Sequence, residues 1–418
     1  MELKILHFIP NIPSDEGFTS FFETFLSLMT QQAEVHLATL SPAPSFTPAG
    51  CHLHCIGSGK SDYGKNGYCN LLALQKQYLK LLYNLMPDLI HVHGSYHFIN
   101  SRIALWSKKR GFPVVFSPYG GMNPDYIEAE YGMRTWKIIS YQKKMTTEAG
   151  AVLSSDPKES EYLHSMHPTP RVEFISDPRN DEYWGDENYT HSTMELYHKV
   201  LNSDKGIHID QNSREALSAL LHLSLTSSTE RTPLCSEDIL NLRSITASQW
   251  HDIYLFAAEQ GVVSNIEEGI AKAQLNVPGI DINTMAHFEP RHPKDHSPLP
   301  SDTLLSKNRL TNRKIFKELR GSEDVIRITC IMLLNIKHHL KQHTLSMRHL
   351  CEIYAVFRFD KMNEDKLAET LSRLGLLKFA QRICQVLSEM AYLDEGYMPV
   401  SALDDQGTRQ IRQNLMKY

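Results

Sequence analysis

Residues 87–122 constrain the fold more than any other stretch, because a helical pattern there separates two short apolar runs. The first run, 89–92, ends in His93-Gly94, and the second, 114–116, ends in Tyr119-Gly120-Gly121. Apolar strands joined by an amphipathic helix are typical of a parallel sheet that is buried on both faces. Ligands bind such sheets at the carboxyl ends of the strands, which is where His93 and Tyr119 would lie.

The same alternation of strands and helices runs through the first 180 residues. Strands are expected at 3–9, 35–40, 53–56, 89–92, 114–117, 151–154 and 172–176. Helices are expected from Thr19 or Ser20 to Met29 and at 71–85, 99–109, 134–147 and 158–164. This order predicts a Rossmann-like, doubly wound parallel α/β domain over residues 1–180.

Two glycine-bearing segments of this half resemble nucleotide-binding loops without matching one. The first turn carries Gly17 alone, and not the three-glycine fingerprint of a dinucleotide-binding dehydrogenase. Residues 57–67, GSGKSDYGKNG, lack the spacing of a phosphate-binding loop. We therefore interpret residues 57–67 and 41–50 as surface loops.

Residues 188–418 show successive amphipathic helical patterns with polar or glycine stops, and no alternating strands. Plausible helix caps are Ser236 and Thr246. A loop at 278–305 rich in proline and histidine interrupts the pattern, and its low apolar content predicts an exposed or mobile segment. The second half is therefore expected to be an all-α domain.

Length and charge limit the classes of partner. A chain of 418 residues is long enough for two domains. A net charge of -5 gives no overall attraction to nucleic acid or to an anionic membrane. No window approaches the ~20 apolar residues of a membrane span, so at most peripheral membrane association is expected. The opening residues do not read as a secretory signal, and seven dispersed cysteines suggest reduced thiols and a cytoplasmic location.

The segment Cys51-His-Leu-His-Cys55 contains ligand types that could hold a soft metal ion. In a strand, however, alternate side chains point to opposite faces of the sheet. We therefore expect an ordinary strand with buried thiols here, and we assign no metal site from the sequence.

Four segments together resemble the amino-terminal domain of GT-B glycosyltransferases, in particular family 4. They are ILHFIPNIPSDEGFTSFFETFLSLM, DLIHVHGSY, FSPYGGMNPDYI and YQKKMTTEAGAVLSSDPKESEYL, and the resemblance covers about residues 1–178. Residues 346–390 show a weaker local resemblance to the helical part of an uncharacterised nucleotidyltransferase-like family, whose Gly-Ser and paired-aspartate signature is absent from this sequence.

The family resemblance implies a site at the strand ends. His93 matches the second histidine of the family's HxHG-like strand end, which lies against the transferred sugar, and His93 is the expected catalytic residue. The alternative is a histidine that is hydrogen-bonded in a strand-end turn. His91, two residues earlier on the same face, is expected to be structural.

The remaining substrate-binding residues implied by the resemblance lie in three turns: Gly17, Thr19, Gly94, Tyr119, Gly120 and Gly121. In the family, a glycine pair in the first turn lets substrate approach the backbone, and a charged residue often follows the pair. This sequence keeps one glycine, Gly17, followed by Phe18 and Thr19. The alternative for Gly120 and Gly121 is that they build a tight turn.

A GT-B enzyme holds its nucleotide sugar mainly in a second Rossmann-like domain, and residues 180–418 lack that domain's glutamate-pair signature. Three functions follow. One is a glycosyltransferase of cytoplasmic surface-glycan assembly that transfers or binds a sugar, with a nucleotide sugar as donor, a glycan as acceptor and no metal cofactor. The second is an inactive scaffold or glycan-binding module whose helical domain contacts a protein partner. The third is an enzyme completed in trans, with another chain supplying the donor site.

Overall fold

The computed structural model describes residues 3–40, 46, 48–57, 71–131, 141–179, 185–226 and 234–416. The expected loop at 57–67 lies outside these residues except for Gly57, as does most of the loop at 41–50. Residues 134–140 of the expected helix at 134–147 also lie outside them.

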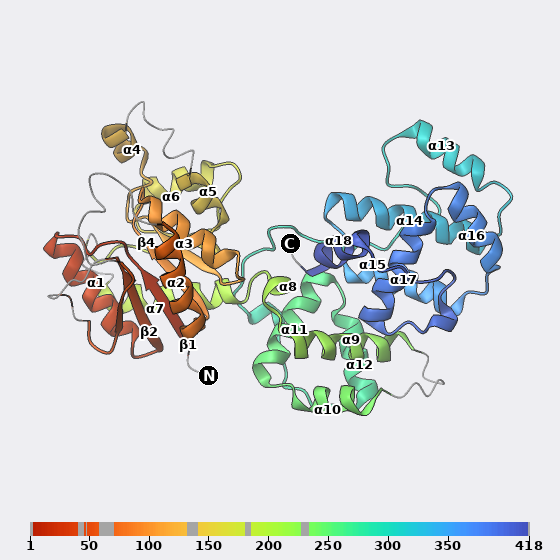
Figure 1. Cartoon of the computed structure of the whole chain (residues 1–418), viewed down its shortest axis with the longest axis horizontal. Coiled ribbons are helices and arrows are strands. Elements are labelled where there is room, and N and C mark those ends of the chain that lie inside the picture. Colours follow the sequence, from red (N-terminus) through yellow and green to blue (C-terminus); the bar gives the residue numbers. More distant parts are fainter. Residues whose placement is uncertain are drawn as a thin grey trace. The chain divides into compact units, whose positions relative to one another are not determined.

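The first half contains the predicted parallel sheet. In the described residues its strands run in the order β3-β2-β1-β4-β5-β6-β7, and all neighbouring pairs are parallel. The strands are β1 (Leu3–Phe8), β2 (Ala33–Thr39), β3 (His52–Cys55), β4 (Leu89–His93), β5 (Val114–Ser117), β6 (Ala151–Ser154) and β7 (Val172–Phe174). The Rossmann-like α/β prediction is confirmed, and β1 and β4 lie side by side at the centre of the sheet (Figure 1).

Helices cover both faces of this sheet. They are α1 (Glu16–Met29), α2 (Leu71–Leu85), α3 (Phe98–Lys108), α4 (Pro124–Tyr131), α5 (Lys143–Glu148), α6 (Pro157–Ser165) and α7 (Gly185–Leu201). One apolar core joins the sheet to α1 and α7, and a second core joins its other face to α2, α3 and α6. Helix α1 begins earlier than expected, because Asp15 rather than Thr19 or Ser20 is its N-cap and accepts a hydrogen bond from the Phe18 amide.

The second half is helical throughout its described residues. Its helices are α8 (Lys205–His208), α9 (Gln211–Leu225), α10 (Ser236–Ser244), α11 (Ala247–Gln260), α12 (Val263–Ala273), α13 (Arg309–Glu318), α14 (Asp324–Gln342), α15 (Met347–Phe359), α16 (Glu364–Arg373), α17 (Leu377–Ala391) and α18 (Gln406–Met416), with short 3-10 turns at η3 (Ile282–Thr284) and η4 (Glu395–Tyr397). Thr246 caps α11 as predicted, in a capping box with Gln249, whereas Cys235 and not Ser236 is the N-cap of α10.

The loop expected at 278–305 is irregular apart from η3, but its second part is fastened to the helices. The Ser346 hydroxyl donates to the carbonyl of Asp295 at 2.8 Å, and the Leu299 amide donates to Glu352 at 2.7 Å. Leu299 itself is buried in the core of the helices. Residues 296–298 are exposed as expected, whereas the expectation is wrong for Leu299, which hydrogen bonds on either side hold against the helices.

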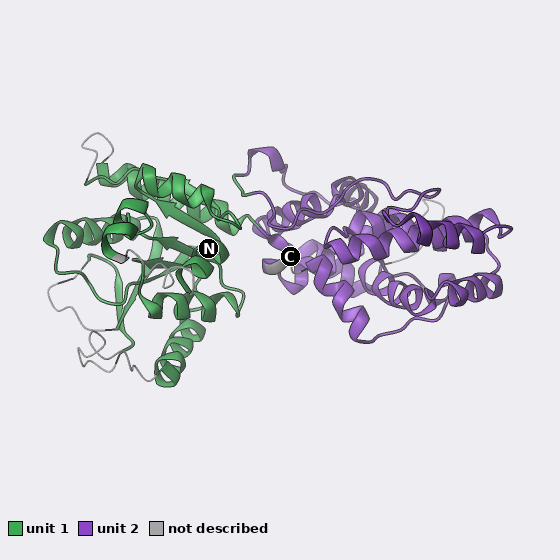
Figure 2. Cartoon of the chain, turned by 90° about the horizontal axis from the view of Figure 1, so that it is seen from above, with its two compact units in different colours: residues 1–203, 286–288 green, residues 204–285, 289–418 purple. Residues whose placement is uncertain are grey.

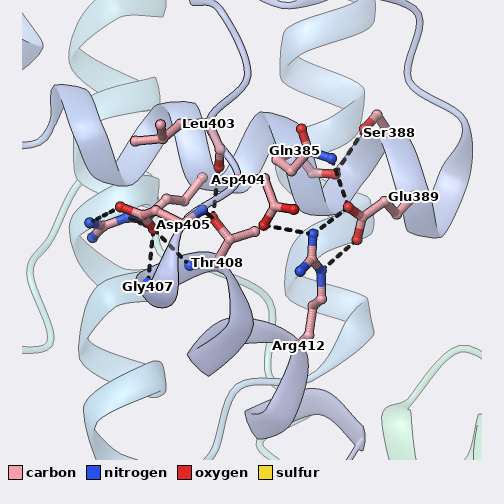
Figure 3. A network of polar contacts seen from close by, with 10 residues as sticks. Gln385, Ser388, Glu389, Leu403, Asp404, Asp405, Gly407, Thr408 and Arg412 are labelled. Carbon is pink, nitrogen blue, oxygen red and sulfur yellow. Dashed lines mark hydrogen bonds and ion pairs between the residues drawn. The ribbon is translucent and has the colours of Figure 1, made fainter.

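Helix α18 is held to α17 by ion pairs that Figure 3 shows from close by. Asp405, just before α18, accepts hydrogen bonds from the amides of Gly407 and Thr408 and a two-pronged bond from Arg382. Arg412, further along α18, pairs with Glu389 and Asp404. These contacts fix the last helix of the described chain on the bundle.

The chain divides into two compact units, coloured separately in Figure 2. Unit 1 comprises residues 1–203 and 286–288, and unit 2 comprises residues 204–285 and 289–418. Helix α7 belongs to unit 1 because it packs on α1 and β6. The sequence predicts that residues 1–180 and 188–418 fold as separate domains, and this stays a prediction.

None of the helices in the described ranges has both the length and the apolarity that crossing a bilayer requires.

Candidate functional site

Three histidines meet at the carboxyl end of the central strands. His93 ends β4, His91 precedes it on the same face, and His7 on β1 lies beside His91 in the sheet register. The rings of His91 and His93 are 4.0 Å apart between centroids, and those of His7 and His93 are stacked at 5.1 Å. All three side chains are completely buried.

Burial makes these rings neutral. It lowers the pKa of His7 to about 3. The pKa values of His91 and His93 fall well below 6.5, mainly through burial and further through the neighbouring histidines. At neutral pH each ring therefore carries one N–H group and one acceptor nitrogen.

A chain of hydrogen bonds fixes which nitrogen carries the proton in two of these rings. His7 Nε2 lies 3.3 Å from the Met29 sulfur, which can only accept, so His7 donates from Nε2. His7 Nδ1 is then an acceptor, and His93 Nε2 donates to it across 2.9 Å. His93 Nδ1 in turn accepts from the Tyr119 hydroxyl at 2.8 Å. Both nitrogens of His93 are thus used inside the domain.

His91 is held in the same way by two hydroxyl groups. Its Nδ1 lies 2.5 Å from the hydroxyl of Tyr197 on α7, and its Nε2 lies 2.7 Å from the hydroxyl of Ser117 at the end of β5. His91 therefore links three elements of unit 1. This agrees with the structural role expected for it.

Aromatic side chains of α1 lie over the three histidines. Phe22 contacts the His93 ring edge-on at 4.9 Å between centroids, and Phe18 stacks on Phe22 at 5.6 Å. Phe18 also meets Tyr119 edge-on at 5.1 Å. The Arg179 guanidinium lies 5.3 Å from the centre of the Phe18 ring and pairs with the buried carboxylate of Asp177. These groups, Phe18, Phe22, Tyr119 and Arg179, lie over His93, and we call them the aromatic plug.

The predicted turn residues lie around this plug with different degrees of exposure. Gly17 is exposed in the first turn of α1, and Thr19, next to it, donates its hydroxyl to the carbonyl of Pro13 at 2.9 Å. Gly94 and Gly120 are half-buried and have φ angles of +84° and +78°. Gly17 and Thr19 are thus on the helix rather than in a loop.

The turn at residues 119–121 is tightly packed against the turn after β4. A Cβ atom on Gly121 would lie 1.7 Å from Ser95 Oγ, so any other residue here would force Ser95 to move. Gly120 has open space where a Cβ would be, and Tyr119 has a φ of +52°. Gly120 is therefore the part of this turn that can face a ligand.

Glu159, on α6, supports this turn from behind. Its carboxylate accepts the Met122 amide at 2.8 Å and the Ser154 hydroxyl at 3.1 Å. Burial raises the pKa of Glu159 to about 7, although these hydrogen bonds act in the opposite direction. The sequence interpretation missed this residue, as it missed His7 and Tyr197; a lone histidine inside the apolar first strand was the available signal.

One ring nitrogen from each of His7, His91 and His93 lies within 4.8 Å of the other two. Imidazole nitrogens are common ligands of metal ions. A metal ion here would have to replace hydrogen bonds that already engage both nitrogens of each ring. The residues therefore fit an internal hydrogen-bond network better than a resident metal.

Residues 19–182 match the model of the family described as Glycosyltransferase Family 4. A search of curated proteins finds no significant match. Among solved structures, the chain is similar to a UDP-N-acetylglucosamine 2-epimerase from Rickettsia bellii, with 12% sequence identity and a TM-score of 0.33. That similarity covers 59% of this chain and 66% of the epimerase chain, which is just under two thirds of it. The family model does not reach residues 346–390, so the weaker resemblance there stays a prediction.

Proposed function

We propose that this chain, whose amino-terminal domain is of the GT-B glycosyltransferase family 4 type, serves surface-glycan assembly without transferring sugar by itself. One observation carries the proposal. A histidine that contacts a transferred sugar needs a free nitrogen facing the substrate, whereas both nitrogens of His93 are bonded to His7 and Tyr119 beneath the aromatic plug.

The second half supports the same conclusion. Its described residues form helices only, so they do not contain the second parallel sheet that holds the nucleotide sugar in a GT-B enzyme. In this proposal a partner chain supplies the donor site, and the helical unit contacts that partner. The work would take place in the cytoplasm, with at most peripheral attachment to a membrane.

The glycan itself would bind at the accessible rim of the strand ends. There Gly94 and Gly120 are half-buried, and neither carries a side chain that would keep a ligand away from the backbone. The neighbouring aromatic rings suit the apolar face of a sugar.

Calorimetry with the full chain tests the catalytic part of the proposal. We expect no binding of any member of a panel of UDP- and GDP-sugars, and no release of UDP or GDP in the presence of glycan acceptors. Saturable donor binding that is lost in His93→Ala and kept in His164→Ala, a substitution of an exposed histidine on α6, would refute it.

An oligosaccharide array tests the binding part. Gly120→Asn adds a side chain to the rim, and asparagine tolerates a positive φ, so the variant should fold and lose glycan binding. The matched control is Gly111→Asn, because Gly111 has a similar φ of +85° and equally open surroundings but lies after α3. Equal glycan binding by both variants, or none by the unmodified protein, would contradict the proposed rim site.

A further inference from the structure

Three imidazole rings gather at the edge of the sheet, away from the strand ends. β3 is the edge strand and carries His52 and His54, while the neighbouring β2 carries His36. His36 lies opposite His52 in the register, and His54 is two residues further, so all three point to one face. Ring centroids are 4.9 Å apart for His36 and His52, and 5.2 Å apart for His36 and His54.

The two cysteines of the same segment are separated from these rings. Cys51 and Cys55 alternate with the histidines along the chain, and Cys51 packs against the core on the α1 side of the sheet. The alternation expected from the sequence thus divides the segment into two faces. What the sequence did not indicate is that His36, 18 residues before His54, joins the histidine face.

Glu34 orients the central ring of this group. Its carboxylate, which can only accept, takes a hydrogen bond from His36 Nε2 at 2.9 Å. His36 Nδ1 is therefore left as the acceptor nitrogen, and it lies 3.0 Å from His54 Nε2. A carboxylate that accepts one N–H of an imidazole and leaves the other nitrogen free is the usual support of a metal-binding histidine.

Two of the three rings are accessible to solvent. His52 is exposed and His54 half-exposed, and His52 forms no hydrogen bond or ion pair with any part of the chain that the structure describes. Burial lowers the pKa of His36 and of His54, which favours the neutral rings that can bind a metal ion. The strand-end histidines differ in being sealed from solvent with every ring nitrogen engaged.

We propose that His36 and His54, completed by His52, bind a divalent transition metal ion of the class that imidazole prefers, such as Zn²⁺. Two metal–nitrogen bonds of about 2.0–2.1 Å at an angle of about 90–110° separate the nitrogens by about 2.9–3.4 Å, which matches the 3.0 Å between His36 Nδ1 and His54 Nε2. The metal lies to one side of the line between these nitrogens, the hydrogen bond between them breaks, and the His54 proton moves to Nδ1, so the ring stays neutral.

His52 supplies the third nitrogen by rotating about its side-chain bonds, since no hydrogen bond from the described residues holds it, and water takes the fourth position. The metal would then join the edge strand β3 to β2. A four-residue edge strand gains most from such a link, because it has a neighbour on one side only.

The experiment is calorimetric titration of the full chain with Zn²⁺ at pH 7.5, with thiols kept reduced by a phosphine. We expect one equivalent to bind, with an affinity at least tenfold lower in His54→Ala and lower by a smaller factor in His52→Ala. Glu34→Gln should weaken binding by about 10–100-fold while the melting temperature of the metal-free protein is unchanged. His164→Ala and Cys55→Ser should bind as the unmodified protein does, and Mg²⁺ should not bind.

Three results would overturn the site. They are no Zn²⁺ binding by the folded protein, equal binding by His54→Ala, and binding that depends on Cys55 or on His93 instead. Circular dichroism confirms folding of each variant, and the partial exposure of His54 makes its substitution compatible with the fold.

Discussion

Acid should destabilise unit 1 through its buried histidines, and His7→Gln should remove a measurable part of this effect. His7 has a pKa of about 3 in the folded protein against 6.5 ordinarily. The unfolded chain therefore binds the proton first, so the stabilisation is complete above pH 6.5 and is lost as the pH falls toward 3. The free energy of unfolding that is lost through His7 over this range is about 5 kcal/mol, because each unit of difference between the two pKa values corresponds to about 1.4 kcal/mol.

At pH 5 the loss that is due to His7 is about 2 kcal/mol relative to pH 7.5. Glu159 acts in the opposite sense, because its pKa is raised from 4.5 to about 7 and the folded protein binds that proton first. The pH dependence of the unmodified protein alone is therefore ambiguous. The difference between it and His7→Gln isolates the histidine, since glutamine keeps a hydrogen-bonding group that does not titrate in this range.

Hydrogen exchange followed by mass spectrometry suits a chain with two units, because peptides from β1 and β4 report on unit 1 alone. Between pH 7.5 and 5, the opening free energy of these peptides should fall by about 2 kcal/mol less in His7→Gln than in the unmodified protein. His164→Gln should leave the fall unchanged. A fall in His7→Gln equal to that of the unmodified protein would refute the assignment of a neutral, buried His7.

Three further substitutions test contacts described above. Glu159→Gln should lower the free energy of unfolding by at most about 1 kcal/mol at pH 7.5, where the pKa of about 7 leaves the carboxyl partly protonated. Between pH 7.5 and 5, the opening free energy in the same exchange assay should fall by about 2 kcal/mol more in this variant than in the unmodified protein. Gly121→Ala should lower thermal stability by about 1–3 kcal/mol through its clash with Ser95, and adding Ser95→Gly should restore part of it. Asp405 has a pKa lowered to about 2, mainly by Arg382, so its stabilisation is present above pH 3.8 and is lost toward pH 2; Asp405→Asn should speed amide exchange in α18 at pH 7 and abolish this acid sensitivity.

The sequence predicted the strands of unit 1 well because each is a short apolar run with a polar stop, a purely local signal. It also placed His93 and Tyr119 at strand ends. It did not predict that His7 and His93 meet, because β1 and β4 are neighbours only through the order of strands in the sheet. Helix α7 was assigned to the helical half for a similar reason: its periodicity is local, but its packing on α1 is not.

The departure at Phe18 was visible in the sequence, but its consequence required the structure. A glycine or a charged side chain in the first turn would leave the strand end open to water. Phe18 instead covers Tyr119 and, through Phe22, His93. Under the proposed function, the buried, neutral state of the histidines and the closure of the sugar site have the same physical cause.

This common cause makes Phe18→Ala informative. The substitution should cost about 3 kcal/mol, as for other buried phenylalanines, and should admit water to the Tyr119 and His93 rings. Hydration should raise the pKa of His93 toward 6.5, so NMR of ring-labelled histidine should show one more histidine titrating above pH 5 than in the unmodified protein. Phe46→Ala is the control, because Phe46 is also buried and stacks on Phe22 at 5.8 Å without a ring contact to Tyr119 or His93. If both variants lose similar stability and only Phe18→Ala changes the histidine titration, the plug is what keeps His93 neutral. If neither variant changes the titration, burial by the sheet alone keeps His93 neutral, and the plug does not explain the closed site.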